Sequence, residues 1–347
     1  MNTAKTDTIA VTSKLIVGVD IAKADFAVAT VWCEQHTYSG KTPNNPAECV
    51  AFVNRMEELQ QACGAETIHL VLEPTGGYEL QLVSEAYRRN WRVTLVNPLT
   101  VRHWQQGRGK RGKTDRQDAI MLAAFGADKN PPHQQPTDEA AAALDSLLRR
   151  QTDLEQLLRS ERNRLGQVLL NPHTPQAVQQ SIQQMIETLE QECVAIKAAI
   201  QLLFANHVKL ARQLKQLCSV PAIGKKSAPY LLALFHRFYA KTSGNGTAKQ
   251  LVAFVGLDPK PHDSGTSVHR RPTISKQGDS PMRSRLYLCA LGGVRGRNHL
   301  HTLYSSFLAR GKAKKLALVA CARKALVWAW AVFTQDTAFD SARFVNA

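Results

Sequence analysis

Two aspartates three residues apart directly follow a cluster of cations in the segment GKRGKTDRQDAIMLA, residues 109–123. If this segment is helical, Asp115 and Asp118 share a face, because side chains three positions apart are neighbours on a helix. Two further acids, Asp20 and Glu73, each close an apolar run typical of a buried strand. Four converging carboxylates need a cation between them, and an all-oxygen ligand set suits Mg²⁺ or Mn²⁺. Such a site supports metal-dependent cleavage of a phosphodiester.

Each acid taken alone has a simpler interpretation. Aspartate is common in the first turn of a helix, where free N–H groups and the helix dipole favour negative charge. Asp20 could begin a turn, and Glu73 could be an ordinary surface residue. We favour a metal site because all four acids stand at element ends that could meet.

The pattern of residues 14–128 predicts one α/β domain that positions these acids. Three strands come first, then a helix, a strand, a helix, a strand and a last helix, which is the order of a ribonuclease-H-like domain. The expected strands are 15–20, 26–32, 35–42 at the sheet edge, 67–73 and 92–97, and the expected helices are 47–63, 78–89 and one after Lys113.

Two long helical patterns follow a Pro-rich break, NPPHQQP, at residues 130–136. They are separated by a predicted turn, NPHTP, at residues 171–175. The second pattern repeats an apolar residue every seven positions, at Ile182, Leu189, Ile196 and Leu203. This favours a helical middle domain over 137–212, either an antiparallel hairpin or a coiled-coil contact between subunits.

The last predicted domain, residues 213–335, is mainly α-helical and begins with a possible nucleic-acid-binding turn. The segment VPAIGKK resembles a helix-hairpin-helix, whose glycine turn presents backbone N–H groups to phosphates. Gly224, Lys225 and Lys226 would make that contact, although Ala222 replaces the usual first glycine. A plain helical turn is the alternative.

The net charge of +16 points to a polyanionic partner, and nucleic acid fits better than an acidic membrane surface. From Lys260 to Lys324 fourteen Lys and Arg face only two Asp. No membrane span or signal peptide is expected, so we place the protein in the cytoplasm. Besides the three turn residues, the expected nucleic-acid contacts are Arg108, Lys110, Arg111, Lys113, Arg270, Arg271, Lys276, Arg283, Lys312, Lys314 and Lys315.

Several segments together resemble the DEDD transposases of the IS-one-ten insertion-sequence family, relatives of the DNA invertases of pilin-type loci. The matching segments span nearly the whole chain: VGVDIAK, LEPTGGY, GKTDRQDA, VPAIG, FVGLDPKPHDSGTS, ISKQG, LARGK and FDSAR. The resemblance implies a RuvC-like N-terminal domain whose four acidic residues match Asp20, Glu73, Asp115 and Asp118. It also implies a serine nucleophile in a C-terminal transposase domain, at Ser264 in DSGTS.

The family further implies a structured noncoding guide RNA, encoded by the element, that pairs with donor and target DNA. The sequence thus favours a recombinase that uses Mg²⁺ and Ser264, working as a homodimer or homotetramer because recombination holds two duplexes together. Alternatives are a DNA invertase, a RuvC- or RNase-H-like nuclease that uses water, and a non-enzymatic nucleic-acid-binding protein.

The residues around Ser264 do not by themselves identify it as a nucleophile. An Asp-Ser-Gly-Thr run is typical of a turn, because Asp and Ser bond their own backbone and Gly accepts positive φ. The dense positive charge around it would stabilise charge on a phosphate under attack. Thr266 and Ser267 are rival hydroxyls in the same turn.

Overall fold

A computed structural model describes residues 13–107, 114–264 and 268–344, without the side chains of residues 261–272. The chain forms two compact units. Unit 1 comprises residues 1–136 with 240–243, and unit 2 comprises 137–239 with 244–347. The unit boundary falls at the end of the Pro-rich break. The separate domain status of residues 137–212 stays a prediction.

Unit 1 contains a mixed five-stranded sheet with the order β3-β2-β1-β4-β5. The first three strands are antiparallel, whereas β1, β4 and β5 run parallel. The five expected strands are confirmed, including the edge position of β3, although β5 ends two residues early. Their bounds are β1 Lys14–Ile21, β2 Asp25–Trp32, β3 Gln35–Pro43, β4 Thr67–Leu72 and β5 Arg92–Leu95.

The helices of unit 1 are α1 Pro46–Cys63, α2 Leu80–Arg88, α3 Pro98–Gln106 and α4 Asp115–Lys129. Only α3 is absent from the sequence prediction. It begins where Asn97 accepts a hydrogen bond from the backbone N–H of Leu99 at 3.0 Å, with Pro98 in the first turn. This cap directs the chain into a helix immediately after β5.

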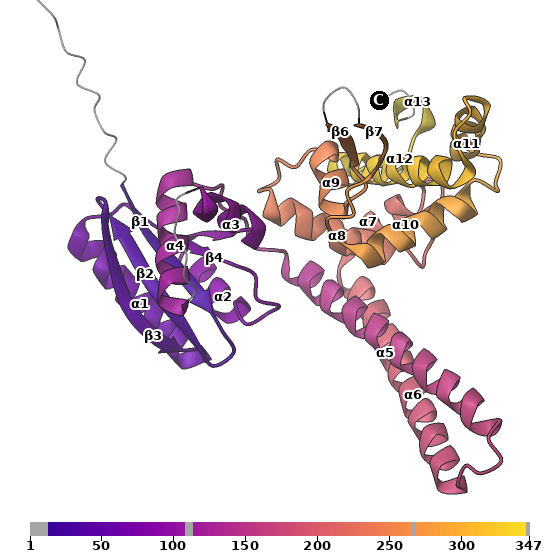
Figure 1. Ribbon diagram of the computed structural model, residues 1–347, viewed down its shortest axis with the longest axis horizontal. Coiled ribbons are helices and arrows are strands. Elements are labelled where there is room, and N and C mark those ends of the chain that lie inside the picture. The colour runs from indigo at the N-terminus through magenta and orange to yellow at the C-terminus, as the bar shows by residue number, and fades with distance from the viewer. Residues whose placement is uncertain (1–12, 108–113, 265–267, 345–347) are drawn as a thin grey trace, which may run out of the picture. The chain divides into compact units, whose positions relative to one another are not determined.

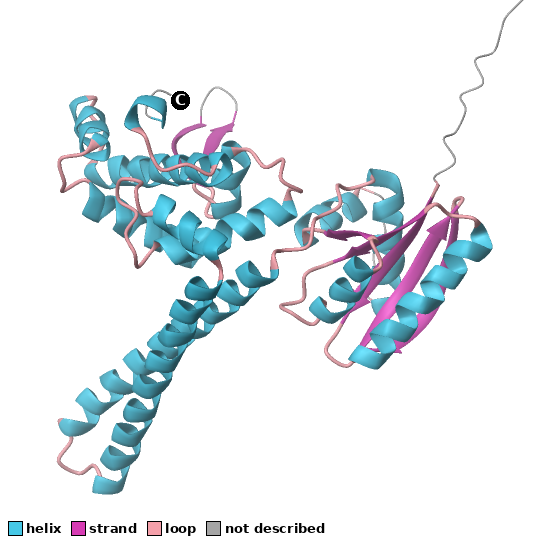
Figure 2. Cartoon of the chain, turned by 180° about the vertical axis from the view of Figure 1, so that it is seen from behind, coloured by secondary structure: helices cyan, strands magenta, loops and turns pink. Residues whose placement is uncertain are grey.

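The two faces of the sheet are covered by different helices. Leu15, Val17 and Val19 of β1 pack with residues of α1 and α2 in one buried cluster. Ile16, with residues of β2 and β4, packs against α4 in another. Figure 1 accordingly shows α4 in front of the strands, and the reverse view in Figure 2 shows α1 in front.

Helix α4 lies directly on β1 because β1 carries a glycine at the crossing point. A Cβ on Gly18 would stand 2.2 Å from the backbone N of Ala123 and 2.4 Å from the carbonyl O of Ala119. Any larger residue would therefore push the helix away from the sheet. The close approach fixes the position of the first turn of α4.

Unit 2 begins with the helical hairpin α5 Glu139–Leu169 and α6 Gln176–Asn206. Leu154, Leu189 and Cys193 form a small buried cluster between the two helices. Near the start of α5, Leu144 and Leu148 instead join the main core of the unit. The predicted antiparallel hairpin is confirmed within one chain, and Figure 1 shows the two helices side by side.

The remainder of unit 2 is mainly helical. Helix α12 is long and apolar enough to cross a membrane, but 61% of its apolar window is buried in the protein. Trp328, Leu326 and Val332 of α12 belong to the main core, as expected for a core helix. The bounds are α7 Val208–Leu217, α8 Ala228–Lys241, α9 Ala248–Val255, β6 Pro259–Ser264, β7 Val268–Ile274, α10 Ser280–Gly293, α11 His299–Ala309, α12 Lys314–Gln335 and α13 Ser341–Phe344.

Candidate active site and nucleic-acid interface

Asp20 and Glu73 lie side by side at one end of the sheet. Strands β1 and β4 are parallel and pair Val19 with Leu72, so the next residues, Asp20 and Glu73, are adjacent. Val19 and Leu72 face the α1 side. Because side chains alternate along a strand, Asp20 and Glu73 face the α4 side. Both are half-buried.

The first turn of α4 reaches the same end of the sheet. A Cβ on Gly126 would meet Ile16 and Val71, whereas Ala119 and Ala123 lie over Gly18, so α4 runs antiparallel to β1. Asp20 stands two residues beyond Gly18, which is about 7 Å along the strand. The same distance along α4, from Ala119 and Ala123 towards its first residue, covers about four to five residues and leads to Asp115 and Asp118. Asp118 is half-buried.

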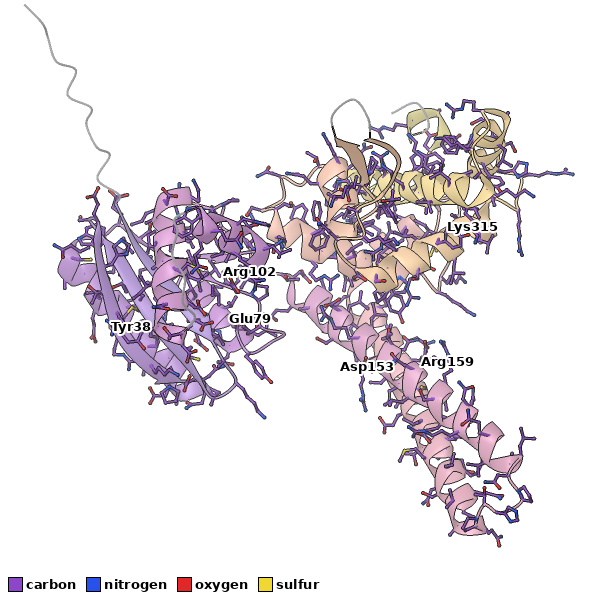
Figure 3. All side chains as sticks on the ribbon, viewed as in Figure 1. Tyr38, Glu79, Arg102, Asp153, Arg159 and Lys315 are labelled. Carbon is purple, nitrogen blue, oxygen red and sulfur yellow. The ribbon has the colours of Figure 1, made fainter. Side chains whose placement is uncertain are left out.

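Two polar side chains fix the loops that follow β1 and β4. Asn44 donates from Nδ2 to the carbonyl oxygens of Ala22 at 3.0 Å and Tyr78 at 3.1 Å, which ties the loops together. The Glu79 side chain, which Figure 3 labels, accepts from the backbone N–H groups of Thr75 and Gly77 at 3.1 and 2.9 Å. It also accepts from the Thr75 hydroxyl at 2.8 Å.

Glu79 is 5% exposed and was not predicted as a functional residue. Burial alone would raise the pKa of its carboxyl, but the hydrogen bonds outweigh burial and lower the pKa. The charged side chain therefore organises the turn next to Glu73. An acid two residues after the Gly76-Gly77 pair was the available signal, since such turns expose backbone N–H groups.

Lys41 of β3 contributes a cation that the sequence pattern does not predict. Its Nζ lies 2.6 Å from Oδ2 of Asp115 and 3.5 Å from Oδ1 of Asp25. The hydrogen bond between Lys41 and Asp115 raises the pKa of the lysine and lowers that of the aspartate. The Asp115 side chain is 57% exposed, so solvent weakens the pair.

A bulge in β3 is what turns Lys41 towards α4. Ala29 pairs with Tyr38 and Ala27 with Lys41, so β3 has one residue more than β2 in this interval. Gly40, at φ +98°, accommodates the irregularity. Tyr38 and Lys41 consequently both face α4, although residues three apart in a regular strand face opposite ways. Tyr38 lies under Arg116, with Cζ 5.0 Å from the ring centroid.

The residues at this end fit a divalent metal by their chemistry. Their donors are carboxylate oxygens, which Mg²⁺ and Mn²⁺ prefer, and Asp20, Glu73 and Asp118 share one end and one face of the sheet. Within the described residues no three His, Cys, Asp or Glu side chains are gathered closely enough to hold a metal ion. Asp115 is bound to Lys41, and the described residues do not gather the four predicted ligands into one cluster.

The predicted nucleophile lies at the end of a two-stranded hairpin in unit 2. Ser264 is the last residue of β6 and pairs with Val268 of β7, while its side chain lies outside the described residues. Thr266 and Ser267 also lie outside them. The base of the hairpin is held by Asp258, whose carbonyl accepts from the N–H of Ser275 at 2.8 Å and whose carboxylate accepts from the Ser275 hydroxyl.

The predicted helix-hairpin-helix turn connects α7 to α8. Ala222 adopts φ +78°, a left-handed conformation that favours glycine. Its backbone geometry is thus the one that a glycine would provide, despite the substitution. Gly224, Lys225 and Lys226 are exposed, and a Cβ on Gly224 would enter open space. A phosphate could approach this turn closely.

The other predicted nucleic-acid contacts differ in their surroundings. Lys276, Lys312, Lys314 and Lys315 are exposed, and Figure 3 labels Lys315 on α12. Arg283 is half-buried and donates from Nη1 to the carbonyl of Val255 at 3.0 Å, so it also supports the end of α9. Arg108, Lys110, Arg111 and Lys113 lie outside the described residues, as do the side chains of Arg270 and Arg271.

Two family models match the chain. Residues 17–175 match the transposase model DEDD_Tnp_IS110, which includes the four acids. Residues 214–305 match the model described as transposase IS116/IS110/IS902 family, which includes Ser264 and the α7–α8 turn.

Curated proteins match over most of the chain. A pilin gene-inverting protein of Moraxella lacunata is 31% identical over 333 residues, which is 94% of this chain and 98% of the relative. The pilin gene-inverting protein of Moraxella bovis matches to the same extent. An uncharacterized 43.6 kDa protein of insertion element IS110 from Streptomyces coelicolor is 26% identical, over 57% of this chain and 53% of the relative. With both family models and a full-length relative above 30% identity, the chain belongs to the IS110 family of transposases, as the sequence motifs predicted.

Proposed function

We propose that this DNA transposase or recombinase cleaves and rejoins DNA with Ser264 as nucleophile and a divalent metal at Asp20, Glu73, Asp115 and Asp118. One observation supports the metal site: Val19 pairs with Leu72, and Asp20 and Glu73 are the residues that directly follow this pair at the end of the sheet towards which α4 begins. The sheet order is consistent with an RNase-H-like, RuvC-like domain.

The serine reaction conserves the energy of the phosphodiester. The Ser264 oxygen bonds to phosphorus, the bond from phosphorus to one sugar oxygen breaks, and the serine proton passes to that leaving oxygen. The phosphoserine diester then receives the hydroxyl of another DNA end, and the serine leaves with its proton restored. No external energy source is needed, because one phosphodiester is exchanged for another.

The residues of unit 1 would orient the DNA backbone for this exchange. A bound Mg²⁺ or Mn²⁺ would supply positive charge that draws phosphate oxygens into place. Asp20, Glu73 and Asp118 would hold it, and Asp115 would join them on release from Lys41. Glu79 and Asn44 would keep the two loops from spreading as the carboxylates approach one another.

DNA inversion is the second candidate, and one observation favours it. Both full-length relatives above 30% identity are named pilin gene-inverting proteins. Inversion and transposition use the same cleavage and rejoining chemistry and differ in how the ends are arranged. Recombination in a bacterial plasmid reporter with inverted or separate sites would distinguish the two.

A guide RNA and self-association complete the proposal. The net charge of +16 and the exposed Lys225, Lys226, Lys312, Lys314 and Lys315 support binding of DNA and of a structured noncoding RNA in the cytoplasm. The hairpin leaves apolar side chains exposed, including Leu170, Val194 and Leu202 at 86%, 67% and 61%. A homodimer or homotetramer would cover such residues, and light scattering would measure its mass.

Binding of Mn²⁺ tests the metal site without relying on catalysis. We expect the wild-type protein to bind Mn²⁺, measured by electron paramagnetic resonance, and Asp118→Asn to bind it far more weakly and to lose DNA cleavage. Glu155→Gln, an exposed change on α5, provides the control. Equal Mn²⁺ binding by Asp118→Asn and wild type would contradict the assignment.

A further inference from the structure

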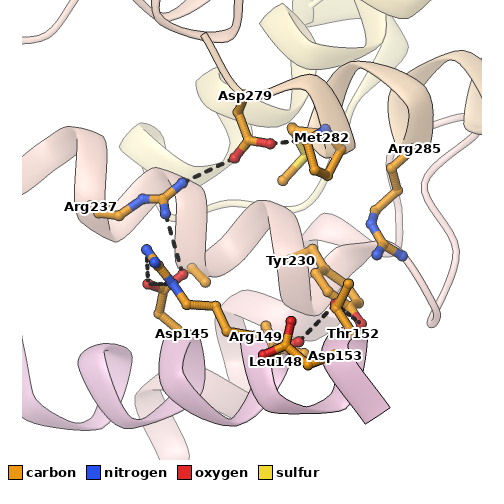
Figure 4. Close-up of a pocket in the computed structure, with 12 residues that line it drawn as sticks. Asp145, Leu148, Arg149, Thr152, Asp153, Tyr230, Arg237, Asp279, Met282 and Arg285 are labelled. Atoms are coloured by element: carbon orange, nitrogen blue, oxygen red, sulfur yellow. Dashed lines mark hydrogen bonds and ion pairs between the residues drawn. The ribbon is translucent and has the colours of Figure 1, made fainter. Parts of the chain in front are cut away.

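Unit 2 contains a cavity of about 260 Å³ between α5, α8 and the start of α10, separate from the hairpin that carries Ser264 (Figure 4). Its apolar lining includes Leu148 and Met282, which are 3% and 6% exposed. Three arginines and three aspartates also line it. The formal charges cancel, so the cavity is not arranged as a simple phosphate site.

Two of the arginines and two of the aspartates form a network of ion pairs along one wall of the cavity. Arg237 lies 3.6 Å from Asp145 and 3.3 Å from Asp279. Arg149 binds Asp145 at 2.9 Å. Asp279 also accepts from the N–H of Met282 at 2.8 Å, which caps α10. These four charged groups are therefore occupied with one another.

The third arginine and the third aspartate are arranged differently. Cζ of Arg285 lies over the Tyr230 ring, 3.3 Å from its centroid, and Arg285 has no ion pair within the described residues. Its in-plane N–H groups stay able to donate, because stacking occupies only the faces of the guanidinium. Asp153 is exposed on α5, with neither a hydrogen bond nor an ion pair in the described part of the chain. Figure 4 shows both side chains at the cavity.

A ligand that matches these groups must be flat and must present acceptors and donors on adjacent edges. Guanine does so: O6 and N7 accept from an arginine fork, and N1–H and the N2 amino group donate to a carboxylate. The ring could pack on the apolar lining and beside the Arg285–Tyr230 pair, as bases pack in pockets that receive unstacked nucleotides. We propose that this cavity binds one unpaired guanine of a nucleic-acid strand.

The test compares strands that differ in one base. Labelled eight-residue oligothymidylates carrying a single central guanine, hypoxanthine or adenine are titrated with the full-length protein. All strands have the same phosphates, so their affinity ratios isolate the base. We expect guanine to bind about tenfold more tightly than hypoxanthine, which lacks the N2 amino group and hence a hydrogen bond to a carboxylate. Matching RNA strands show whether the preferred source is RNA or DNA.

Variants separate the cavity from the general basic surface. Asp153→Asn should remove the preference for guanine over hypoxanthine and leave oligothymidylate binding unchanged. Arg285→Lys keeps the charge but loses the fork, so it should weaken guanine binding selectively. Glu155→Gln changes the charge of a neighbouring residue on α5 and should retain the preference. Equal wild-type affinity for the three bases, or an undiminished preference in Asp153→Asn, would overturn the proposal.

Discussion

The ammonium group of Lys41 lies 2.6 Å from Oδ2 of Asp115, so a strand at the sheet edge already supplies a cation to one of the four predicted metal ligands. A divalent metal that binds Asp115 must compete with this lysine. Replacing Lys41 by Met should therefore tighten Mn²⁺ binding by about two- to fivefold, the range expected for loss of an exposed ion pair.

Titration of Mn²⁺ into both proteins would measure this change. Lys209→Met removes the same charge from an exposed site on α7 and should leave the affinity unaltered. Unchanged binding by Lys41→Met would show that the lysine does not compete with the metal, and weaker binding would show that it supports the metal site. Absence of Mn²⁺ binding by the wild type would instead refute the metal site itself.

The turn between α7 and α8 should become more stable when its left-handed alanine is replaced. Ala222 has φ +78°, a conformation that costs about 1 kcal/mol or more for a residue with a Cβ. Ala222→Gly should raise the free energy of unfolding in urea by about 1 kcal/mol. Ala211→Gly, inside α7, should lower it by a similar amount. A destabilised Ala222→Gly would mean that methyl packing outweighs backbone strain.

Acid should destabilise unit 1 through a buried histidine. Burial, followed by the charges of Lys14, Arg92 and His133, lowers the pKa of His69 from 6.5 to about 4. Between those values the unfolded chain takes up a proton that folded His69 resists, so stability falls as pH falls. The loss approaches about 1.4 kcal/mol per pH unit below pH 6.5, and amounts to about 1.6 kcal/mol between pH 6.5 and pH 5.

A comparison of wild type with His69→Gln would separate the contribution of His69 to acid destabilisation from that of the other titrating groups. Urea unfolding at pH 6.5 and pH 5 should show a smaller loss in the variant, which has no imidazole to protonate. His69 bonds Thr94 at 2.8 Å, so the variant is also expected to be less stable at neutral pH. Equal acid sensitivity of the two proteins would place the titrating group elsewhere.

Nucleic-acid affinity should depend steeply on salt if the lysines before and within α12 contact phosphates. With about six to ten phosphates contacted, affinity should fall about a thousandfold or more between 50 and 200 mM salt. Changing Lys312, Lys314 and Lys315 together to Gln should reduce the slope of log affinity against log salt by about two to three. As a control, the same change at Lys197, Lys209 and Lys215 should leave the slope unchanged. Equal slopes for the two triple variants would show that Lys312, Lys314 and Lys315 do not contact phosphates.

The sheet of unit 1 was predictable because its strands carry strong local patterns. In apolar runs such as LIVGVD, successive side chains point to the two opposite faces of the sheet, and both faces are packed. The order of the elements then indicates which strands are neighbours. The placement of Asp20 beside Glu73 follows from that order. Helix α3 was missed although its Asn97-Pro98 start was a readable signal.

The partner of Asp115 could not be predicted in the same way. Lys41 faces α4 only because β3 contains a bulge after Tyr38, and a one-residue irregularity reverses which residues face the helix. The cavity at Arg285 depends on three helices that are distant in sequence. Neither relationship has a local pattern, since both arise from tertiary packing.

The covalent link between Ser264 and DNA is the most direct measure of the proposed recombinase. Wild type, Ser264→Ala and Ser267→Ala would be incubated with Mg²⁺, matching DNA and the RNA encoded beside the gene, then separated on a denaturing gel. We expect DNA retarded by attached protein for wild type and Ser267→Ala, and neither adduct nor cleavage for Ser264→Ala. A retarded band that persists in Ser264→Ala, or efficient cleavage by that variant with free ends, would contradict the serine mechanism and favour a nuclease that uses water.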